Sequence, residues 1–418
     1  MHVVVAGQGY VGLPLAVRAA EVGHRVVGYD VDPNRVQQLV SGESYVEDVT
    51  SARLRTVLDS GAYSVTADAT ALPRYDLAVI TVPTPLRDGA PDLTHVEACA
   101  HTLGEHLRPG ATVVLESTTY PGTTEELVLP ILEKASGLIS GMDFHVGFSP
   151  ERIDPGNTAW PFERTPKVVS GIDATSLDMV KGFYDTVVET TVPVSGTRVA
   201  ELTKLIENTF RHVNIALVNE TAMLARLLGV NAWEAIDAAA SKPFGYMRFT
   251  PGPGVGGHCL PIDPSFLSWK VERTAGVPFR FVDLANDVNS HMPDYVVGRL
   301  TQAFNTRRMA VCGSRVLLLG LAYKPNTSDA RESPSARVAE LLLNLGADVR
   351  GADPHVVEDI HACPHLIRVA ATEEEIAASD AVVLLTDHAE FDYEAIRRHA
   401  PYVLDCRNRL SGANIDVL

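Results

Sequence analysis

The stretch HVVVAGQGYVG, residues 2–12, decides the fold of the start of this chain. Its first five residues are mostly apolar, which predicts a strand buried inside a parallel sheet. Gly7 then permits a tight turn, Gly9 lets the backbone approach a pyrophosphate, and Gly12 lets the following helix pack closely on the strand. We expect that helix at 13–22, with its N-terminus facing the pyrophosphate. The stretch therefore predicts a dinucleotide-binding unit.

A second strand, predicted at 24–30, ends in Asp30, 18 residues after the last glycine of the motif. A carboxylate at this point accepts hydrogen bonds from the ribose hydroxyls of NAD and repels the 2′-phosphate of NADP. Arg35 leaves an alternative open, because a nearby arginine can accommodate that phosphate or can be a solvated helix residue. NAD is therefore the expected cofactor, with Tyr10 and Val11 of the glycine loop beside it.

The later sequence repeats this plan. Two more buried strands are predicted at 76–82 and 112–116, and near the C-terminus a strand at 315–320, a helix at 335–345 and a strand ending in Asp353 follow in the same order. Strands that alternate with helices predict parallel sheets covered on both faces. We expect an α/β fold with two Rossmann-like parallel-sheet domains joined by a long central helix. The second domain lacks the glycine motif and is expected to bind something other than a dinucleotide.

The central helix is predicted from 197 to 228, where 32 residues contain neither glycine nor proline and apolar residues recur at helical spacing. A helix of this length is longer than a small domain needs. We expect it to link two domains and to make a twofold contact in a homodimer. The predicted boundaries are an NAD-binding domain at 1–195, a central helical region at 196–300, and a C-terminal Rossmann-like domain at 301–418.

A second glycine-rich stretch, GPGVGGHCLPIDP at 252–264, surrounds Cys259 in the central region. Glycines let backbone approach a bulky neighbour, and a thiol in such a loop is better placed to be a nucleophile than to fill a core. Cys259 can add to an aldehyde and form a thioester once a hydride has left, and Asp263 can act as the base. Lys204 and Asn208 are four residues apart, so they share a helix face and can stabilise an oxyanion, or can simply be surface residues.

Charge and composition restrict the function classes. The 418 residues include 35 basic and 52 acidic ones, a formal net charge of −17, which disfavours nonspecific binding to nucleic acid or anionic membrane. No apolar run is long enough to span a membrane, and five widely spaced cysteines argue against a disulfide framework, so a cytoplasmic protein without a signal peptide is expected. No metal site is expected, because His361, Cys363 and His365 have no second cluster at zinc-like spacing.

Eight motifs, in order, resemble the UDP-glucose/GDP-mannose dehydrogenase family of nucleotide-sugar 6-dehydrogenases, and the resemblance covers essentially the whole chain. They are GQGYVG, VPTP (82–85), ESTTYPGTT (116–124), SPERIDPGN (149–157), ELTKLIENTFRHVNIALVNE (201–220), PGPGVGGHCLPIDP (251–264), GLAYKPNTSDARES (320–333) and DCRN (405–408). The resemblance implies a four-electron oxidation of the sugar C6 hydroxyl to a carboxylate by two NAD, with the C-terminal domain binding the nucleotide sugar.

The resemblance also implies roles for individual residues. Cys259 looks like the nucleophile that forms the thioester, and Asp263 looks like the residue that activates water or the thiol. Lys204 and Asn208 look like the pair that stabilises the oxyanion, handles protons and contacts the substrate. Catalytic water would be positioned by Glu151, which also contacts substrate, together with Thr118, which also contacts the cofactor. The remaining residues implied are Pro83, Thr84 and Arg331 for cofactor binding, and Arg152, Gly256, Lys324 and Arg407 for substrate binding.

One departure from the family pattern concerns the sugar. UDP-glucose dehydrogenases usually carry a second glutamate four residues after the first, and this chain has Pro155 there, with Asp154 one residue earlier. This and the segment 242–270 look closer to the branch that acts on UDP-N-acetyl-hexosamines. The alternatives are a UDP-glucose or dTDP-glucose 6-dehydrogenase and a two-electron hydroxyacid-type dehydrogenase, which would need no Cys259. A non-catalytic NAD-binding interaction module is a further alternative, and it would not need Lys204 or Asn208 either.

Overall fold

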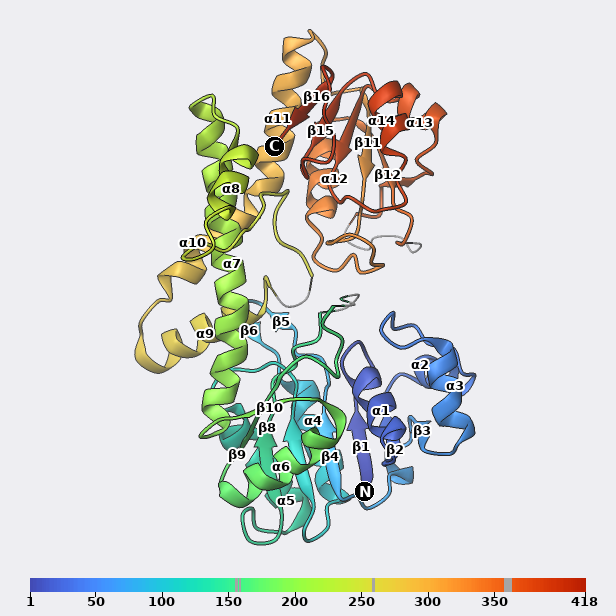
Figure 1. Cartoon of the computed structure of the whole chain (residues 1–418), viewed down its shortest axis with the longest axis vertical. Helices are drawn as coiled ribbons and strands as arrows, with labels where there is room; N and C mark the ends of the chain where they lie inside the picture. Colours follow the sequence, from blue (N-terminus) through green and yellow to red (C-terminus); the bar gives the residue numbers. More distant parts are fainter. Residues whose placement is uncertain (155–156, 158, 258–259, 357–362) are drawn as a thin grey trace. The chain divides into compact units, whose positions relative to one another are not determined.

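The computed structural model describes residues 1–154, 157, 159–257, 260–356 and 363–418, and Figure 1 shows the whole chain. Contacts divide the chain into two compact units. The first unit comprises residues 1–207 and 265–274, and the second comprises residues 208–264 and 275–418. The predicted three-part division at 195/196 and 300/301 stays a prediction.

An eight-stranded sheet forms the centre of the first unit, in the order β10-β9-β8-β7-β4-β1-β2-β3. Six neighbouring strands of this sheet are parallel, in the spatial order β3-β2-β1-β4-β7-β8. Numbered from one to six along the chain, they have the order 3-2-1-4-5-6 of a doubly wound dinucleotide-binding fold. The sequence predicted a fully parallel sheet, and the edge formed by β9 and β10 differs from this prediction, because β9 is antiparallel to β8. The strands are β1 (His2–Ala6), β2 (Arg25–Tyr29), β3 (Tyr63–Thr66), β4 (Leu77–Ile80), β7 (Thr112–Leu115), β8 (His145–Phe148), β9 (Lys167–Gly171) and β10 (Thr191–Pro193).

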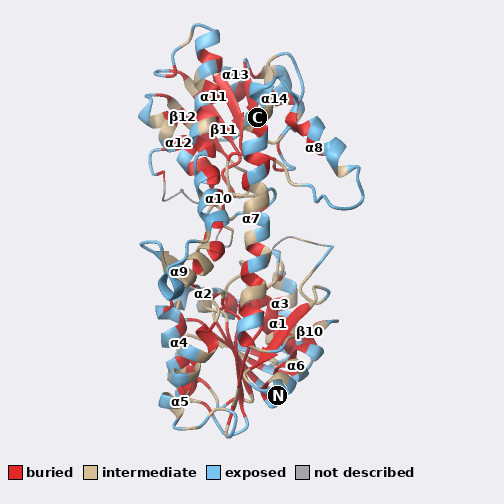
Figure 2. Ribbon diagram, turned by 90° about the vertical axis from the view of Figure 1, so that its left-hand side faces the viewer, coloured by how far each residue is buried: buried red, intermediate tan, exposed pale blue. Residues whose placement is uncertain are grey.

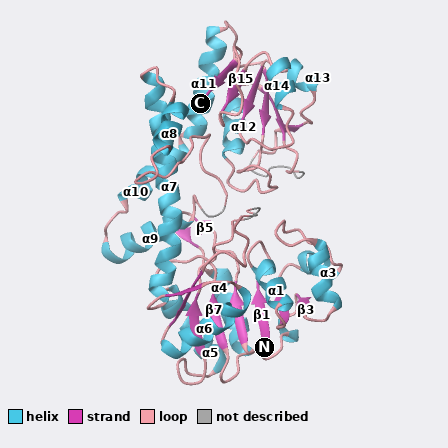
Figure 3. Ribbon diagram, in the orientation of Figure 1, coloured by secondary structure: helices cyan, strands magenta, loops and turns pink. Residues whose placement is uncertain are grey.

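Helices cover both faces of this sheet (Figure 3). They are α1 (Gly12–Glu21), α2 (Pro33–Val40), α3 (Ser51–Asp59), α4 (Thr94–Glu105), α5 (Leu129–Ser136) and α6 (Ala174–Val187), with a short hairpin of β5 (Leu86–Arg87) and β6 (Ala90–Pro91) and the short turns η1 (Ala69–Ala71) and η2 (Thr124–Val128). Val3 and Val5 of β1 face the core under α1, α3 and α6, whereas Val4 and Ala6 face the core under α4 and α5. Burial on both faces explains why residues 3–6 of β1 are all apolar, and Figure 2 shows the strands at the centre of this unit in the colour of buried residues.

The second unit contains a six-stranded, fully parallel sheet in the order β13-β12-β11-β14-β15-β16, which is again 3-2-1-4-5-6 along the chain. Its strands are β11 (Arg315–Leu319), β12 (Asp348–Ala352), β13 (Ile367–Arg368), β14 (Ala381–Leu384), β15 (Val403–Asp405) and β16 (Ile415–Val417). Its helices are α11 (Met292–Thr306), α12 (Pro334–Asn344), α13 (Glu373–Ala378) and α14 (Tyr393–His399). Val316 and Leu318 face α11 and α12, and Leu317 and Leu319 face the core with α13 and α14. The predicted repeat of the Rossmann-like plan is confirmed.

The long helix α7 runs from Thr197 to Leu227, one residue short of the prediction, and its residues up to Glu207 belong to the first unit. It is followed by α8 (Ala232–Ala240), α9 (Asp263–Ala275) and α10 (Arg280–Ser290). Asn231 caps α8, since its side chain accepts hydrogen bonds from the backbone of Trp233 and Glu234. Within the described ranges, no helix is both long and apolar enough to cross a bilayer.

Candidate functional site

The glycine loop after β1 has the geometry that its sequence predicts. Gly7 has a φ of +92°, and Gly12 has no room for a side chain, because an added Cβ would collide with the Gly7 carbonyl oxygen. A Cβ at Gly9 would meet nothing within 4 Å. Space beside Gly9, at the start of α1, fits the approach of a pyrophosphate to backbone N–H groups.

Two residues that sequence reasoning missed hold this loop. Thr81, after β4, donates from Oγ1 to the carbonyl oxygens of Ala6 (2.9 Å) and Gly7 (2.8 Å). Gln8 is fully buried; its Nε2 donates to the Val5 carbonyl oxygen at 2.7 Å, and its Oε1 accepts from the Tyr63 hydroxyl at 2.7 Å. Gln8 occupies the variable position of the glycine motif, so the motif gave no signal for its role.

Asp30, 4% exposed, follows β2 as predicted. Its Oδ2 accepts from the Gln8 backbone N–H at 2.8 Å and from Arg35 Nη1 at 3.0 Å, and its Oδ1 accepts from the Asp32 N–H at 3.0 Å. The guanidinium of Arg35 is therefore engaged by the carboxylate that defines the ribose position. This pairing favours the NAD interpretation over the phosphate-binding alternative for Arg35.

The predicted cofactor residues lie at one edge of the first sheet. Tyr10 and Val11 are in the loop after β1, Pro83 and Thr84 follow β4, and Thr118 follows β7. The strands β7, β4 and β1 are neighbours and parallel, so their carboxyl ends meet at the crevice where doubly wound folds bind ligands. The contacts of these residues with NAD stay predictions.

Lys204 of α7 is buried against the segment that follows β8. Its Nζ donates to the Glu151 carbonyl oxygen at 2.7 Å and lies 3.1 Å from Glu151 Oε2. Lys204 and Glu151 are only 6% and 8% exposed, so a paired charge is held where water is scarce. Arg152, predicted to bind substrate, pairs with Glu207 of α7 and donates to the Pro166 carbonyl oxygen at 2.6 Å.

Asn208 lies one helical turn after Lys204 on α7 and belongs to the second unit. Its Nδ2 donates to Asp263 Oδ2 at 2.5 Å. Asp263 is 2% exposed and is the first residue of α9, where the helix dipole favours a negative charge. The structure thus pairs two of the residues singled out as catalytic. Cys259 lies outside the described residues.

The glycines before Cys259 pack against other segments of the second unit, to which they belong. An added Cβ at Gly252 would lie 2.8 Å from Arg407 Nη1, and at Gly257, whose φ is +81°, it would lie 2.9 Å from the Tyr323 ring. The Gly252 N–H donates to Asn219 Oδ1 of α7 at 2.9 Å. The bulky neighbours expected from these glycines are therefore Tyr323 and Arg407, and Asn219 is an anchor that sequence reasoning missed.

The predicted substrate residues Lys324 and Arg407 and the predicted cofactor residue Arg331 lie in loops at the carboxyl edge of the second sheet. Lys324 and Arg331 are in the loop 320–333 after β11, and Arg407 follows β15. Arg407 Nε donates to the Leu385 carbonyl oxygen at 2.6 Å, and Arg331 forms a two-pronged pair with Asp329 at 2.9 and 2.6 Å. The roles of these residues toward substrate and cofactor, and that of Gly256, stay predictions.

Three side chains in the same region are close enough together to suggest a metal site. The potential ligand atoms of His355, His388 and Glu390 lie within 4.8 Å of one another. Both ring nitrogens of His388 are already engaged, however, since Nδ1 accepts from the Asn326 N–H at 3.0 Å and Nε2 lies 2.9 Å from Asp353 Oδ2. His388 has no lone pair left for a metal ion in this arrangement. Of the alternating residues noted in the sequence, His361 lies outside the described residues.

Known proteins match this chain along its length. The NAD binding domain of the UDP-glucose/GDP-mannose dehydrogenase family matches residues 1–188, the central domain of that family matches 198–291, and its UDP binding domain matches 317–412. A UDP-N-acetyl-D-mannosamine dehydrogenase of Pyrococcus horikoshii is 36% identical over 414 residues, which are 98% of this chain and 96% of the relative. A UDP-N-acetyl-D-glucosamine 6-dehydrogenase of Pseudomonas aeruginosa is 36% identical, over 94% of this chain and 91% of the relative.

Solved structures agree with the sequence matches. A UDP-D-ManNAc dehydrogenase from Pyrococcus horikoshii superimposes with a TM-score of 0.90 at 34% identity, covering 100% of this chain and 99% of its own. A UDP-glucose dehydrogenase from Pyrobaculum islandicum superimposes with a TM-score of 0.88 at 32% identity, covering 100% of this chain and 96% of its own. The chain therefore belongs to the UDP-glucose/GDP-mannose dehydrogenase family of NAD-dependent nucleotide-sugar 6-dehydrogenases.

Proposed function

We propose that this enzyme oxidises the C6 hydroxyl of a UDP-N-acetyl-hexosamine to a carboxylate, with Cys259 as a covalent nucleophile. The observation that carries the chemistry is the pairing of Lys204 with Glu151 and of Asn208 with Asp263, one helical turn apart on α7. Buried, paired cations and amides are suited to stabilise charge on a reacting oxygen. Bound NAD supplies the hydride acceptor, so two NAD remove four electrons from the sugar.

Each side chain has a separate role in the proposed reaction. Lys204 and Asn208 stabilise negative charge on the C6 oxygen while the hydroxyl proton passes to water and a hydride leaves C6, which gives the aldehyde. The Cys259 thiolate adds to the aldehyde carbon and holds the sugar as a thiohemiacetal and then, after the second hydride has left, as a thioester. Asp263 takes the proton of the thiol or of water, and Glu151 with Thr118 orients the water that cleaves the thioester. Hydrolysis releases the carboxylate and regenerates the thiolate.

Relatives that carry UDP-N-acetyl-hexosamine names support the choice of sugar. The relatives from Pyrococcus horikoshii and Pseudomonas aeruginosa are named for UDP-N-acetyl-D-mannosamine and UDP-N-acetyl-D-glucosamine respectively, and each is 36% identical to this chain. Pro155, where UDP-glucose enzymes usually carry a glutamate, points the same way. The overall fold does not discriminate, because a UDP-glucose dehydrogenase superimposes nearly as well.

The test is the amount of NADH formed at completion with excess NAD and a limiting nucleotide sugar. UDP-N-acetylglucosamine and UDP-N-acetylmannosamine are assayed beside UDP-glucose and dTDP-glucose. We expect two NADH per molecule of one acetamido sugar, and no carboxylate from a Cys259→Ala variant. One NADH per sugar would refute the four-electron route in favour of a simple alcohol dehydrogenase. Turnover of UDP-glucose or dTDP-glucose alone would refute the choice of sugar while leaving the chemistry intact.

We further propose that a second copy of the chain binds along α7. Phe210, Leu217 and Leu224 follow one another at intervals of seven residues, and these residues are 47%, 60% and 55% exposed. Residues seven apart lie on one helix face, so these three form an apolar stripe of the kind that pairs with its own symmetry mate.

A cytoplasmic location stays a prediction, with which the free thiols of Cys99, Cys363 and Cys406 are compatible.

A further inference from the structure

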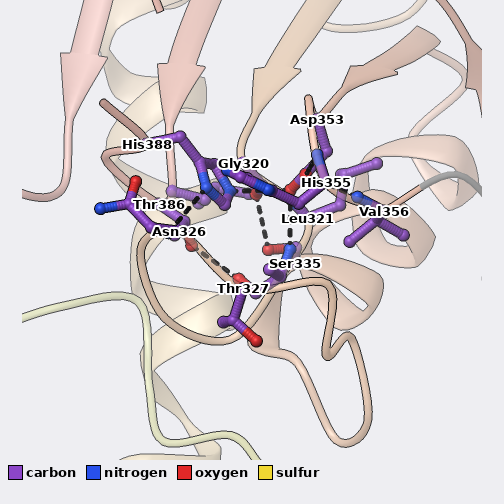
Figure 4. A network of polar contacts seen from close by, with 12 residues as sticks. Gly320, Leu321, Asn326, Thr327, Ser335, Asp353, His355, Val356, Thr386 and His388 are labelled. Atoms are coloured by element: carbon purple, nitrogen blue, oxygen red, sulfur yellow. Dashed lines mark hydrogen bonds and ion pairs between the residues drawn. The ribbon is translucent and has the colours of Figure 1, made fainter. Parts of the chain in front are cut away.

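A polar network joins three strand ends in the second unit (Figure 4). Asp353, directly after β12, is the counterpart of Asp30 in the first unit. Its Oδ2 accepts from the N–H groups of Leu321 and Ala322 at 2.6 and 2.9 Å and also contacts His388 Nε2 at 2.9 Å. Asp30 accepts from one N–H of the loop after β1, that of Gln8, whereas Asp353 accepts from two consecutive N–H groups of the loop after β11 and also contacts His388.

The two partners of His388 select one tautomer of its imidazole ring. The Asn326 N–H can only donate, and it donates to Nδ1 at 3.0 Å, so Nδ1 carries no proton. The carboxylate of Asp353 can only accept, so Nε2 carries the proton. Burial alone would raise the pKa of Asp353, but hydrogen bonds from His388, Val356, Ala322 and Leu321 hold it well below its usual range. His388, fully buried, is therefore a neutral bridge between a carboxylate and a peptide N–H.

Further contacts fasten the same loop to the segment after β14. Thr386 Oγ1 donates to the Ala322 carbonyl oxygen at 2.7 Å, and the Ala389 N–H donates to Asn326 Oδ1 at 2.9 Å. Asn326 has a φ of +58°, a left-handed conformation that asparagine tolerates better than most residues. His388 and its neighbours thus determine the path of the loop at Asn326, two residues after Lys324.

The loop 320–333 in turn supports the glycine loop that precedes Cys259. The Gly257 N–H donates to the Arg331 carbonyl oxygen at 3.0 Å. A Cβ on Gly256 would lie 2.8 Å from Tyr323 Cβ, so the two loops are in direct contact. A shift of the loop after β11 would therefore be transmitted to both Lys324 and the glycines.

We propose that His388 is a positioning residue for the nucleotide-sugar site, which fixes the loop 320–333 by bridging Asp353 and the Asn326 peptide as its neutral tautomer. The proposal rests on the proposed function in one respect, namely that Lys324 and the glycine loop serve the nucleotide sugar. The ring centroid of His388 lies 5.0 Å from that of His355 and 5.5 Å from that of Phe391. The Tyr393 hydroxyl donates to the His388 carbonyl oxygen. His355 itself pairs with Glu390 at 3.1 Å.

Two substitutions of His388 distinguish the effect of its hydrogen bonds from the effect of its side-chain volume. Glutamine offers one acceptor and one donor and does not titrate, so His388→Gln can keep both hydrogen bonds, whereas His388→Leu keeps neither. His355→Gln, in the same cluster but bonded to Glu390, is the matched control. The probe is UDP, whose binding is measured by calorimetry together with that of NAD.

We expect His388→Leu to weaken UDP binding by about tenfold, the effect of losing one or two buried hydrogen bonds, and NAD binding by much less, because Arg331 alone of the predicted cofactor residues lies in the loop 320–333. His388→Gln and His355→Gln should bind UDP as the wild type does. Because NAD binding reports mainly on the first unit, far-UV circular dichroism checks that the whole chain is folded. Unchanged UDP binding by a folded His388→Leu protein would overturn the proposal.

Rescue by the conservative variant supplies a readout that side-chain volume alone would not move. UDP binding that is retained in His388→Gln and lost in His388→Leu assigns the effect to the two hydrogen bonds of His388. Equally weak UDP binding by folded His388→Gln and His388→Leu proteins would overturn the proposal. Absence of turnover with every nucleotide sugar, with this binding pattern intact, would count against the proposed function alone.

Discussion

At the scale of single residues, Glu201 shows how a buried carboxylate organises backbone far away in the sequence. It lies on α7, is fully buried, and accepts hydrogen bonds from the Gly122 N–H (2.6 Å), the Thr124 N–H (2.9 Å) and Thr124 Oγ1 (2.7 Å). Burial raises the pKa of Glu201 from 4.5 to about 7, against the opposing effect of these hydrogen bonds. Glu201 therefore fixes the segment after Thr118 while titrating near neutrality.

A pH-dependent stability follows from this carboxyl group. Because its pKa is raised in the folded state, its favourable contribution is complete below pH 4.5 and is lost as pH rises through about 7. The loss corresponds to about 3 kcal/mol. We expect the difference in unfolding free energy between wild type and Glu201→Gln to fall by that order across this range in denaturant titrations.

The matched control for Glu201 is Glu272, an exposed glutamate on α9 in the first unit. Glu272→Gln should change the free energy of unfolding by only a few tenths of a kcal/mol, because a substitution at an exposed position removes no buried interaction. A Glu201→Gln difference that is independent of pH would contradict the assignment of the raised pKa to Glu201.

The sequence revealed residues whose roles follow from local spacing and missed those whose partners are distant. Gly7, Gly9, Gly12 and Asp30 were found because one strand–turn–helix–strand unit sets their geometry. Thr81 bonds to a carbonyl 74 residues away, Glu201 to an N–H 79 residues away, and His388 to a carboxylate 35 residues away. No local pattern marks such partners, because only the folded sheet brings them together.

At the scale of elements, periodicity predicted α7 well and strand direction poorly. A run without glycine or proline and with helical apolar spacing can hardly form anything else, and the helix found at Thr197–Leu227 matches the predicted 197–228. The direction of β9 leaves no such trace, because a buried strand is apolar in either orientation. Its antiparallel pairing with β8 therefore became visible only in the structure.

The apolar stripe on α7 leads to a prediction about assembly. A Leu217→Glu, Leu224→Glu double variant places two charges on the stripe, where burial in an interface would be costly. We expect the wild type to sediment as a dimer at micromolar concentration and the variant as a monomer with unchanged circular dichroism. Ile139→Glu, which charges an equally exposed apolar residue away from α7, should stay dimeric. A wild type that sediments as one chain would refute the proposed dimer.

At the scale of the whole molecule, an acidic chain must provide cationic sites for two anionic ligands. The net charge is −17, so the ligands depend on local donors rather than on the overall field. The family match assigns NAD binding to residues 1–188 and UDP binding to residues 317–412, and each of these ranges lies in a unit whose sheet contains six strands in the order 3-2-1-4-5-6. The repeated architecture thus differs at the loop after its first strand, which leaves space beside Gly9 in the first unit and is held by Asp353 and His388 in the second.

This division of labour predicts that one substitution in each unit affects one ligand only. Asp30→Asn keeps an oxygen for the Gln8 N–H but loses the charge that the ribose hydroxyls bond to, so NAD binding should weaken about tenfold with UDP binding unchanged. Arg407→Met keeps the apolar stem of the side chain but loses the guanidinium, so UDP binding should weaken about tenfold or more with NAD binding unchanged. Calorimetry with each ligand alone on each variant gives a two-by-two comparison. Equal weakening of both ligands by either variant would mean that the substitution acts through folding or through coupling of the two units, and that binding is not divided between them as the family match indicates.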